Sequence, residues 1–258
     1  MFEISVADNK ESITREYDEK SLRVGSMPFY YHIHLYMPCN QKCIMCMPDG
    51  SHSKAILPYE NFVQFFEQIK PYAEHLTLIG GEPLMYPWIN DVLNLISQYP
   101  VEVTINTNAT ILNERMCNKL LSLHTLNLKC SIDAATPEMY FKIRGQDQFH
   151  HVKKNLERFS LIAKGKPEMR QIFIFVVMKE NLNEVLPFID FVKPMTPYKI
   201  EFHPVRHVRD WVVENSTGWI FNGKEQSCEF FAEEYNSVMQ QASEKCKVEG
   251  IDSEVLFL

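Results

Sequence analysis

Met37-Pro-Cys-Asn-Gln-Lys-Cys-Ile-Met-Cys-Met47 is the stretch of sequence from which the fold can be worked out. Its three cysteines, Cys39, Cys43 and Cys46, follow a C-x3-C-x2-C spacing. Three thiolates so close in sequence can hold three irons of a 4Fe-4S cube and leave the fourth iron without a protein ligand, whereas a cluster that only carries electrons normally has four cysteines. The spacing therefore predicts one 4Fe-4S cluster with an open iron where a small molecule can bind.

A structural zinc site is the alternative for the same cysteines. Zinc sites favour paired C-x2-C units and close their shell with a fourth Cys or His. His32, His34 and His52 are near enough in sequence to supply such a ligand. On spacing alone the cluster is favoured and zinc stays open.

The composition is that of an ordinary globular protein. The chain has 258 residues, 45% hydrophobic and 23% charged, and a net charge of -7 without a run of Lys or Arg, so nucleic acid is an unlikely partner. The N-terminus carries acids where a signal peptide has basic residues, and no apolar run is long enough to span a membrane. We expect a cytoplasmic protein without a membrane partner. In a reducing compartment the seven cysteines are ligands and buried thiols, with Cys117 and Cys130 in the core.

Strand and helix patterns alternate along the chain. Helical apolar spacing is found at 59–70, 88–98, 113–123, 137–163 with an interruption near Gly145, 181–193 and 229–247. Short runs rich in β-branched and aromatic residues predict six strands, at 30–37, 75–79, 101–106, 126–132, 171–178 and 198–203, and a further possible strand at 255–258. This alternation predicts an α/β fold with a parallel sheet, either doubly wound or curled into a barrel.

The unusual polar and glycine residues come directly after successive strands. They are the cysteine loop, Gly80-Gly-Glu-Pro83, Asn106-Thr-Asn108, Ser131 with Asp133, and His203 to His207. Because the carboxyl ends of parallel strands meet at one edge, these residues should gather on one rim, where α/β proteins carry their chemistry.

These motifs together resemble the radical S-adenosylmethionine (SAM) superfamily. The resemblance rests on the cysteine motif, on Gly80-Gly-Glu-Pro83, on Thr107-Asn-Ala109 and on Ser131-Ile-Asp-Ala-Ala-Thr-Pro-Glu-Met-Tyr-Phe-Lys-Ile-Arg-Gly145. It covers about residues 28 to 205, and the last stretch resembles the branch with a twitch or SPASM extension. The resemblance implies a partial (β/α)6 TIM-like barrel with a short C-terminal extension. It divides the chain into an N-terminal segment (1–27), the barrel core (28–205) and a C-terminal part (206–258) that completes or covers the barrel.

The resemblance also implies an enzyme with SAM as its second cofactor. One electron from the cluster, delivered by a flavodoxin or ferredoxin-type donor, would cleave SAM to a 5'-deoxyadenosyl radical, which takes hydrogen from a substrate in peptide or small-metabolite maturation. The cofactor performs this step, and the protein supplies binding, orientation and shielding.

Family roles pass to this sequence position by position. Gly80 and Gly81 would let the backbone approach the methionine amino group, since a Cβ there would block contact, and Glu82 extends that loop. Met45 would touch the adenine.

The remaining SAM contacts lie farther along the chain. Asn108 and Ser131 would contact the ribose or the methionine moiety. Arg144 would pair with the methionine carboxylate, and Asp133 would orient Arg144 or Ser131. Alternatively, Arg144 is a surface residue of a helix and Asp133 caps the helix that starts near Pro137.

The resemblance thins beyond the sixth strand. Residues 205–223 form a long segment with cations and aromatic residues, and long segments of this kind are often functional. We expect Arg206 and Arg209 to face an anionic group of the substrate and Asp210 or Glu214 to act as a catalytic acid or base. Only Cys228 and Cys246 follow, too few for an auxiliary cluster, so either the protein is a compact member or a further domain lies beyond the chain. An iron-sulfur electron carrier or redox sensor and a zinc-stabilised binding protein remain the alternative functions.

Overall fold

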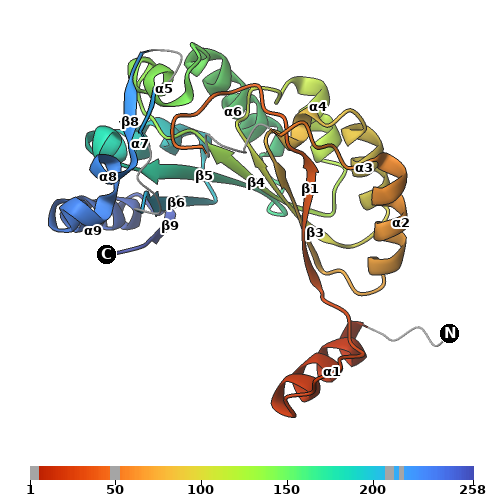
Figure 1. Ribbon diagram of the computed structural model, residues 1–258. Helices are drawn as coiled ribbons and strands as arrows, with labels where there is room; N and C mark the ends of the chain where they lie inside the picture. Colours follow the sequence, from red (N-terminus) through yellow and green to blue (C-terminus); the bar gives the residue numbers. More distant parts are fainter. Residues whose placement is uncertain (1–5, 47–52, 207–211, 215–217) are drawn as a thin grey trace.

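The protein is built on a seven-stranded parallel sheet (Figure 1). The computed structural model describes residues 6–46, 53–206, 212–214 and 218–258. Neighbouring strands follow the order β1-β2-β3-β4-β5-β6-β9, so the chain adds each new strand to the same side of the last. The strands are β1 (Tyr30–Tyr36), β2 (His75–Gly80), β3 (Glu102–Thr107), β4 (Thr125–Ser131), β5 (Met169–Val177), β6 (Lys199–Pro204) and β9 (Asp252–Val255). The six predicted strands and the partial barrel are confirmed.

Helices cover the outer side of the curved sheet, as right-handed crossovers between parallel strands require (Figure 1). Thr136 is the N-cap of α5 (Pro137–Arg144), the first helix of the crossover after β4, where its side chain accepts a hydrogen bond from the Met139 backbone amide. Gly145 ends that helix in a left-handed conformation at φ 72°. Gly145 thus produces the predicted interruption. The crossover helices are α2 (Tyr59–Ile69), α3 (Ile89–Ile96), α4 (Glu114–Leu120), α5 (Pro137–Arg144), α6 (Phe149–Ala163), α7 (Val185–Val192) and α9 (Ala232–Val248).

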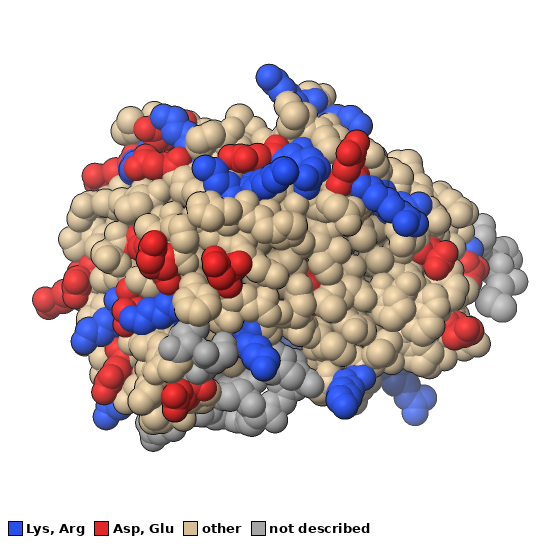
Figure 2. Space-filling model, turned by 90° about the horizontal axis from the view of Figure 1, so that it is seen from above, with Lys and Arg blue, Asp and Glu red and all other residues tan. Residues whose placement is uncertain are grey.

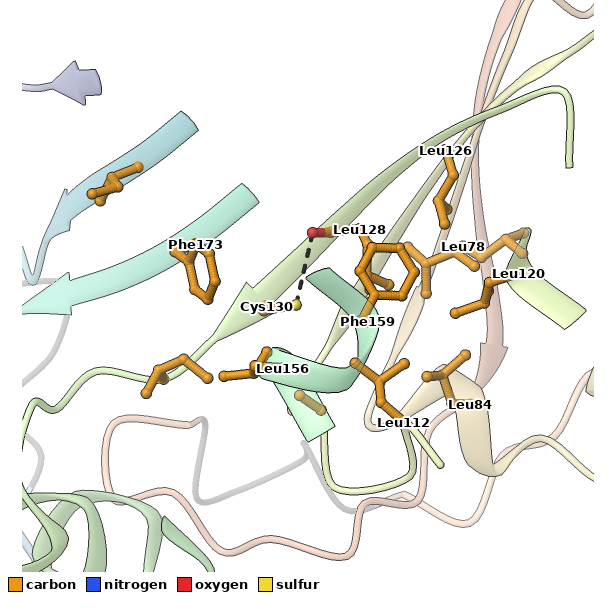
Figure 3. Packing of buried hydrophobic residues seen from close by; sticks show 14 of the residues in the cluster. Leu78, Leu84, Leu112, Leu120, Leu126, Leu128, Cys130, Leu156, Phe159 and Phe173 are labelled. Carbon is orange, nitrogen blue, oxygen red and sulfur yellow. Dashed lines mark hydrogen bonds between the residues drawn. The ribbon is translucent and has the colours of Figure 1, made fainter. Parts of the chain in front are cut away.

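The main core lies between the sheet and these helices. Figure 3 shows Leu126, Leu128 and Cys130 of β4 on the side of the sheet where Leu156 and Phe159 of α6 pack. Cys130 is fully buried there and its thiol donates to the Leu128 carbonyl at 3.8 Å. Since Cys117 is fully buried as well, both are core residues, as predicted.

The C-terminal part differs from the expectation in two ways. The last strand is Asp252–Val255, three residues earlier than predicted, because Lys199 to Phe202 of β6 pair with exactly this stretch. The segment 205–223 contains a two-stranded antiparallel hairpin, β7 (Val212–Glu214) and β8 (Ile220–Asn222), followed by the short helix α8 (Gly223–Gln226). A sequence of mixed charged and aromatic residues carries little strand signal, which is why the hairpin was not predicted.

The first helix, α1 (Val6–Asp18), extends away from the sheet below β1 (Figure 1). Asn9 anchors it to the following segment, because its side chain bonds both the carbonyl and the amide of Met27. In the described part of the chain, none of the helices has the length and apolar character needed to cross a membrane.

Candidate functional site

The cysteine loop leaves the carboxyl end of β1 and runs across the top of the molecule beside α5 (Figure 1). Two contacts tie it to α5: the Ile44 amide donates to the Ile143 carbonyl at 2.9 Å, and Gln41 Nε2 donates to the Tyr140 hydroxyl at 2.6 Å. Gln41 is 1% exposed although it lies in a loop. The loop is therefore fastened to a helix whose residues lie about a hundred positions later in the chain.

The thiols of this loop have the surroundings of cluster ligands. Cys39 Sγ accepts hydrogen bonds from the backbone amide of Gln41 at 3.4 Å and from Asn108 Nδ2 at 3.7 Å. Cys43 Sγ accepts one from Arg144 Nη1 at 3.4 Å. Donors of this kind stabilise a thiolate, the form that binds iron. Cys39 and Cys43 are partly buried and Cys46 is exposed.

These residues fit a cluster with an open corner. Within the described residues, no three Cys, His, Asp or Glu side chains are arranged around a single metal ion. Such convergence is not required of cube ligands, because each thiolate binds a different iron.

Burial raises the pKa of the Cys43 thiol to about 11, against the opposing charge of Arg144. A thiol in this environment keeps its proton at neutral pH unless a metal replaces it.

The two glycines at the end of β2 make room for the start of the cysteine loop. A Cβ on Gly80 would lie 2.1 Å from the Tyr36 carbonyl oxygen, and one on Gly81 would lie 2.2 Å from the Met37 carbonyl oxygen. Gly80 also has φ 147°, which only glycine adopts readily. The described contacts thus give these glycines a structural reason that the sequence did not reveal: any side chain would push the cysteine loop away. Their predicted contact with the methionine amino group stays a prediction.

Glu82 organises the rim from inside the protein. It is fully buried. Its carboxylate accepts hydrogen bonds from the Thr107 hydroxyl at 2.8 Å, from the backbone amide of Asn108 at 2.7 Å and from the backbone amide of Leu84 at 3.1 Å. Burial raises the pKa of Glu82 to about 7 in spite of these donors. This carboxyl group joins the loops after β2 and β3.

Asn108 links that rim to the cysteines. Its Nδ2 donates to Asn40 Oδ1 at 2.8 Å as well as to Cys39 Sγ, while its Oδ1 accepts from the Thr110 hydroxyl at 2.6 Å. The side chain is therefore held in one orientation at the predicted SAM site.

Arg144 and Asp133 form a buried ion pair next to the cysteine loop. Arg144 Nη2 lies 2.5 Å from Asp133 Oδ2, and the two side chains are 6% and 0% exposed. Burial alone would lower the pKa of Arg144, but the charge of Asp133 raises it, so the guanidinium stays charged. The alternative of Arg144 as a surface residue is wrong. Asp133 does not cap α5 either, since Thr136 is its N-cap.

The predicted orienting role of Asp133 matches this pairing. Asp133 has φ 61°, and its Oδ1 accepts from the Val176 amide at 2.9 Å, which fixes the carboxylate from the neighbouring strand.

The other predicted residues are spread over the rim. Ser131 ends β4 and is partly buried. Met45 packs against a small apolar cluster formed by Ile44, Ile143, Met178 and Phe221, which joins the cysteine loop, α5 and the hairpin.

The predicted acids and cations of the 205–223 segment are not brought together at this site by the described contacts. Glu214 ends β7 and is exposed, as is Arg206. Asp210 and Arg209, like His52 of the zinc alternative, lie outside the described residues.

Lys129 and Glu201, which the sequence patterns did not single out, form a polar group with His203 farther inside the sheet. Lys129 Nζ lies 2.8 Å from Glu201 Oε2, and His203 Nε2 lies 3.3 Å from the same oxygen. The available signal was a charged residue within each of two strands of a parallel sheet, whose strands normally read as continuous apolar runs.

Two curated proteins are similar to about 70% of the chain. It is 27% identical over 202 residues to the molybdenum cofactor biosynthesis protein moc-5 of Caenorhabditis elegans, covering 71% of this chain and 32% of that protein. It is 24% identical over 194 residues to the GTP 3',8-cyclase of Vibrio vulnificus (strain YJ016), covering 70% of this chain and 55% of that enzyme. The chain thus spans between about a third and just over half of the length of these relatives.

Solved structures share the fold. SuiB of Streptococcus suis, bound to its precursor peptide SuiA, matches 95% of this chain and 52% of that chain with a TM-score of 0.71 at 16% identity. The structure of anSMEcpe with bound AdoMet and a peptide matches 88% of this chain and 63% of that chain with a TM-score of 0.68 at 18% identity. At these identities the likeness concerns the fold.

The family follows from the sequence itself. The model of the radical SAM superfamily matches residues 35–192, more than half of the chain, and includes the cysteine loop and all SAM contacts predicted above. Proteins of this family are enzymes that use a 4Fe-4S cluster and SAM, which confirms the predicted cofactors and favours the cluster over zinc. The chain belongs to the radical SAM superfamily.

Proposed function

We propose that this protein cleaves SAM reductively and uses the resulting radical to take a hydrogen atom from a peptide or small polar metabolite. The observation that carries the proposal is the convergence of the family motifs: Asn108 contacts Cys39, and Arg144 contacts Cys43. When bound, the cluster and SAM supply the radical chemistry. The chain's own residues hold the thiolates and orient the polar side chains around them.

The residues beside Cys39 and Cys43 have distinct tasks in this proposal. Asn108, fixed by Asn40 and Thr110, would bind the ribose or methionine part of SAM. Arg144, fixed by Asp133, would attract the methionine carboxylate to the side of Cys43. Ser131, Met45 and the Gly80–Gly81 backbone would complete the site. The catalytic role of Asp210 or Glu214 stays a prediction.

One observation supports a peptide substrate and another argues against nucleic acid as a partner. SuiB was solved with its precursor peptide, and it shares the fold of nearly the whole chain. Figure 2 shows acidic and basic side chains interspersed on the described surface seen from above, without a continuous basic band of the kind that binds nucleic acid.

We propose a flavodoxin or ferredoxin-type protein as the electron donor and a cytoplasmic location. We also propose that the chain is divided into segment 1–27, barrel core 28–205 and C-terminal part 206–258.

Anaerobic reconstitution tests the proposal. The protein with reconstituted cluster, SAM and dithionite should yield methionine and 5'-deoxyadenosine, detected by mass spectrometry. Cys46→Ala should abolish both products, and because Cys46 is exposed, its loss should cost little stability. Cys117→Ala, in the core, is the matched control and should retain both products. An iron-loaded protein that forms neither product would instead be an electron carrier or redox sensor.

A further inference from the structure

The inner face of the sheet carries polar side chains of β3, β4 and β6 beside the apolar side chains of β5, whereas the outer face is apolar. Leu126, Leu128 and Cys130 point toward α6 (Figure 3). Successive side chains of a strand point to opposite faces, so Lys129 and Ser131 point to the inner face. The crossover helices lie on the outer side of the arch of the sheet, and none of them covers this face (Figure 1).

Strand register brings Glu201 to the level of the predicted SAM site. Ser131 of β4 pairs with Ile174 of β5, and Ile174 pairs with Glu201 of β6. Glu201 therefore faces the same space as Ser131 from about 10 Å away, the width of two strand spacings.

The Lys129–Glu201–His203 cluster is held together by its carboxylate. Glu201 is 4% exposed and receives Lys129 at 2.8 Å and His203 at 3.3 Å on one oxygen. The side chains of Lys129 and His203 remain 28% and 39% exposed. A buried carboxylate thus fixes an ammonium group and an imidazole, both of which still reach the inner space.

This cluster adjoins the ion pair beside Cys43. His203 pairs in register with Val176, and the Val176 amide donates to Asp133, the partner of Arg144. A molecule that contacts His203 and Lys129 would therefore lie directly beneath the proposed cofactor site.

The charges of the inner face are already balanced. In the described strands, Lys129 pairs with Glu201, Arg170 with Glu102 at 3.7 Å, and Lys199 with Glu254 at 3.4 Å. A phosphate would have to compete with these carboxylates, and its approach to Glu201 and Glu102 would be repelled.

One acceptor on this face has no partner among the residues that the structure describes. Asn106 pairs in register with Lys129, and Asn106 Oδ1 is buried without a hydrogen bond. An unpaired buried acceptor is costly, so a ligand that brings an N–H or O–H group would be favoured.

We propose that Lys129, Glu201 and His203 form the substrate-binding group of this enzyme, and that they take an uncharged, hydrogen-bonding part of the substrate, such as a hydroxyl or amide group. The inference rests on the proposed function, because it assumes that SAM binds at the rim above the Lys129–Glu201–His203 cluster. It selects among the substrates left open there: a peptide or a neutral sugar fits, and a nucleoside triphosphate does not.

Deuterium transfer into 5'-deoxyadenosine tests the substrate class. The probes are deuterated peptides with blocked ends that contain Ser, Thr, Asn and Gln, a deuterated neutral hexose, and GTP deuterated in its ribose. We expect label from a neutral probe and none from GTP. Label from GTP, or from none of the probes while SAM is still cleaved, would overturn the inference. Failure to cleave SAM at all would instead refute the proposed function.

Variants then test the residues. With the active neutral probe, Glu201→Gln and His203→Asn should each lower the ratio of labelled to unlabelled 5'-deoxyadenosine at least about tenfold, as expected for loss of a charged hydrogen bond. His203 is partly exposed, so His203→Asn keeps the test valid if Glu201→Gln does not fold. Lys245→Met is the control, because it removes an ion pair with Asp190 on the outer helices and should keep the wild-type ratio. If both Glu201→Gln and His203→Asn kept the wild-type ratio of labelled to unlabelled 5'-deoxyadenosine, the assignment of these residues to substrate binding would be refuted.

Discussion

Replacing Gly81 by Ala should displace the cysteine loop and weaken iron binding. The new Cβ would lie 2.2 Å from the Met37 carbonyl oxygen and 2.4 Å from that of Pro38, whereas ordinary contact begins at 3.4 Å. The backbones must therefore separate by about 1.2 Å, two residues before Cys39. Because each group is main chain, rotation of a side chain cannot relieve the contact.

The magnitude of the Gly81→Ala effect follows from the contacts that the movement breaks. Overpacking of this kind costs about 1–3 kcal/mol. The hydrogen bonds from the Gly81 amide to Tyr36 and from the Glu82 amide to Pro38, at 2.8 and 3.0 Å, would weaken as well, each worth about 1 kcal/mol. We expect a loss of about 2–4 kcal/mol and, for a domain of this size, a fall in Tm of about 5–15 °C.

The assay compares the cluster-free protein by thermal unfolding and the reconstituted protein by iron analysis. Gly25→Ala is the control, because its Cβ would lie 3.6 Å from Glu16 Oε1, an ordinary contact, and the change in stability should stay within about 0.5 kcal/mol. If Gly81→Ala matched Gly25→Ala in both Tm and iron content, the steric explanation for the glycine pair would be wrong.

Three further changes test other parts of the structure. Asp133→Asn leaves the buried Arg144 without its counter-charge and should cost about 3–5 kcal/mol in the free energy of unfolding, measured in urea. Burial alone would raise the pKa of Glu201, but the hydrogen bonds and charges of its basic partners lower it from 4.5 to about 2. The contribution of the Glu201 carboxylate to the free energy of unfolding is therefore complete above about pH 5 and is lost as the pH falls toward about 2. Glu201→Gln should flatten that part of the stability profile of the cluster-free protein. Phe221→Ala removes a side chain that is 2% exposed beside the cysteine loop, so it should lower iron retention and reduce the free energy of unfolding by up to about 3–5 kcal/mol. Phe257 is 51% exposed, so Phe257→Ala should change neither iron retention nor the free energy of unfolding.

The sequence was sufficient for six strands of the parallel sheet because each of them is a short run rich in β-branched, aromatic and aliphatic residues that alternates with a helical pattern. The rim followed from the same reasoning: Asn108 and Arg144 do reach the cysteine loop, although they are about 70 and 100 residues away from it in sequence. Strand order explains the position of Asn108, since parallel strands place their carboxyl ends side by side. Arg144 ends α5 and reaches the loop because Ile143 and Tyr140 hold that helix against it.

Specific partners could not be predicted in the same way. Glu82 was expected to extend a SAM-binding loop, and the structure adds protein partners that the sequence did not indicate, among them the Thr107 hydroxyl 25 residues later. For Gly81, the structure adds the close approach of the Met37 and Pro38 backbone to the ligand contact that was predicted. These contacts depend on how closely two loops approach, which strand patterns do not determine.

The alternation of side chains along β4 explains how one strand serves both stability and function. Leu126, Leu128 and Cys130 bury apolar surface against α6 and hold the sheet to its helices, so substitutions there should act through the free energy of unfolding. Lys129 lies between Leu128 and Cys130 in sequence and Ser131 directly follows Cys130, but both face the opposite side, where the polar groups of β6 approach. A change at Lys129 can therefore alter what the inner face binds while the outer packing stays intact. A one-residue shift of register would exchange the two faces, and the buried apolar face is what prevents it.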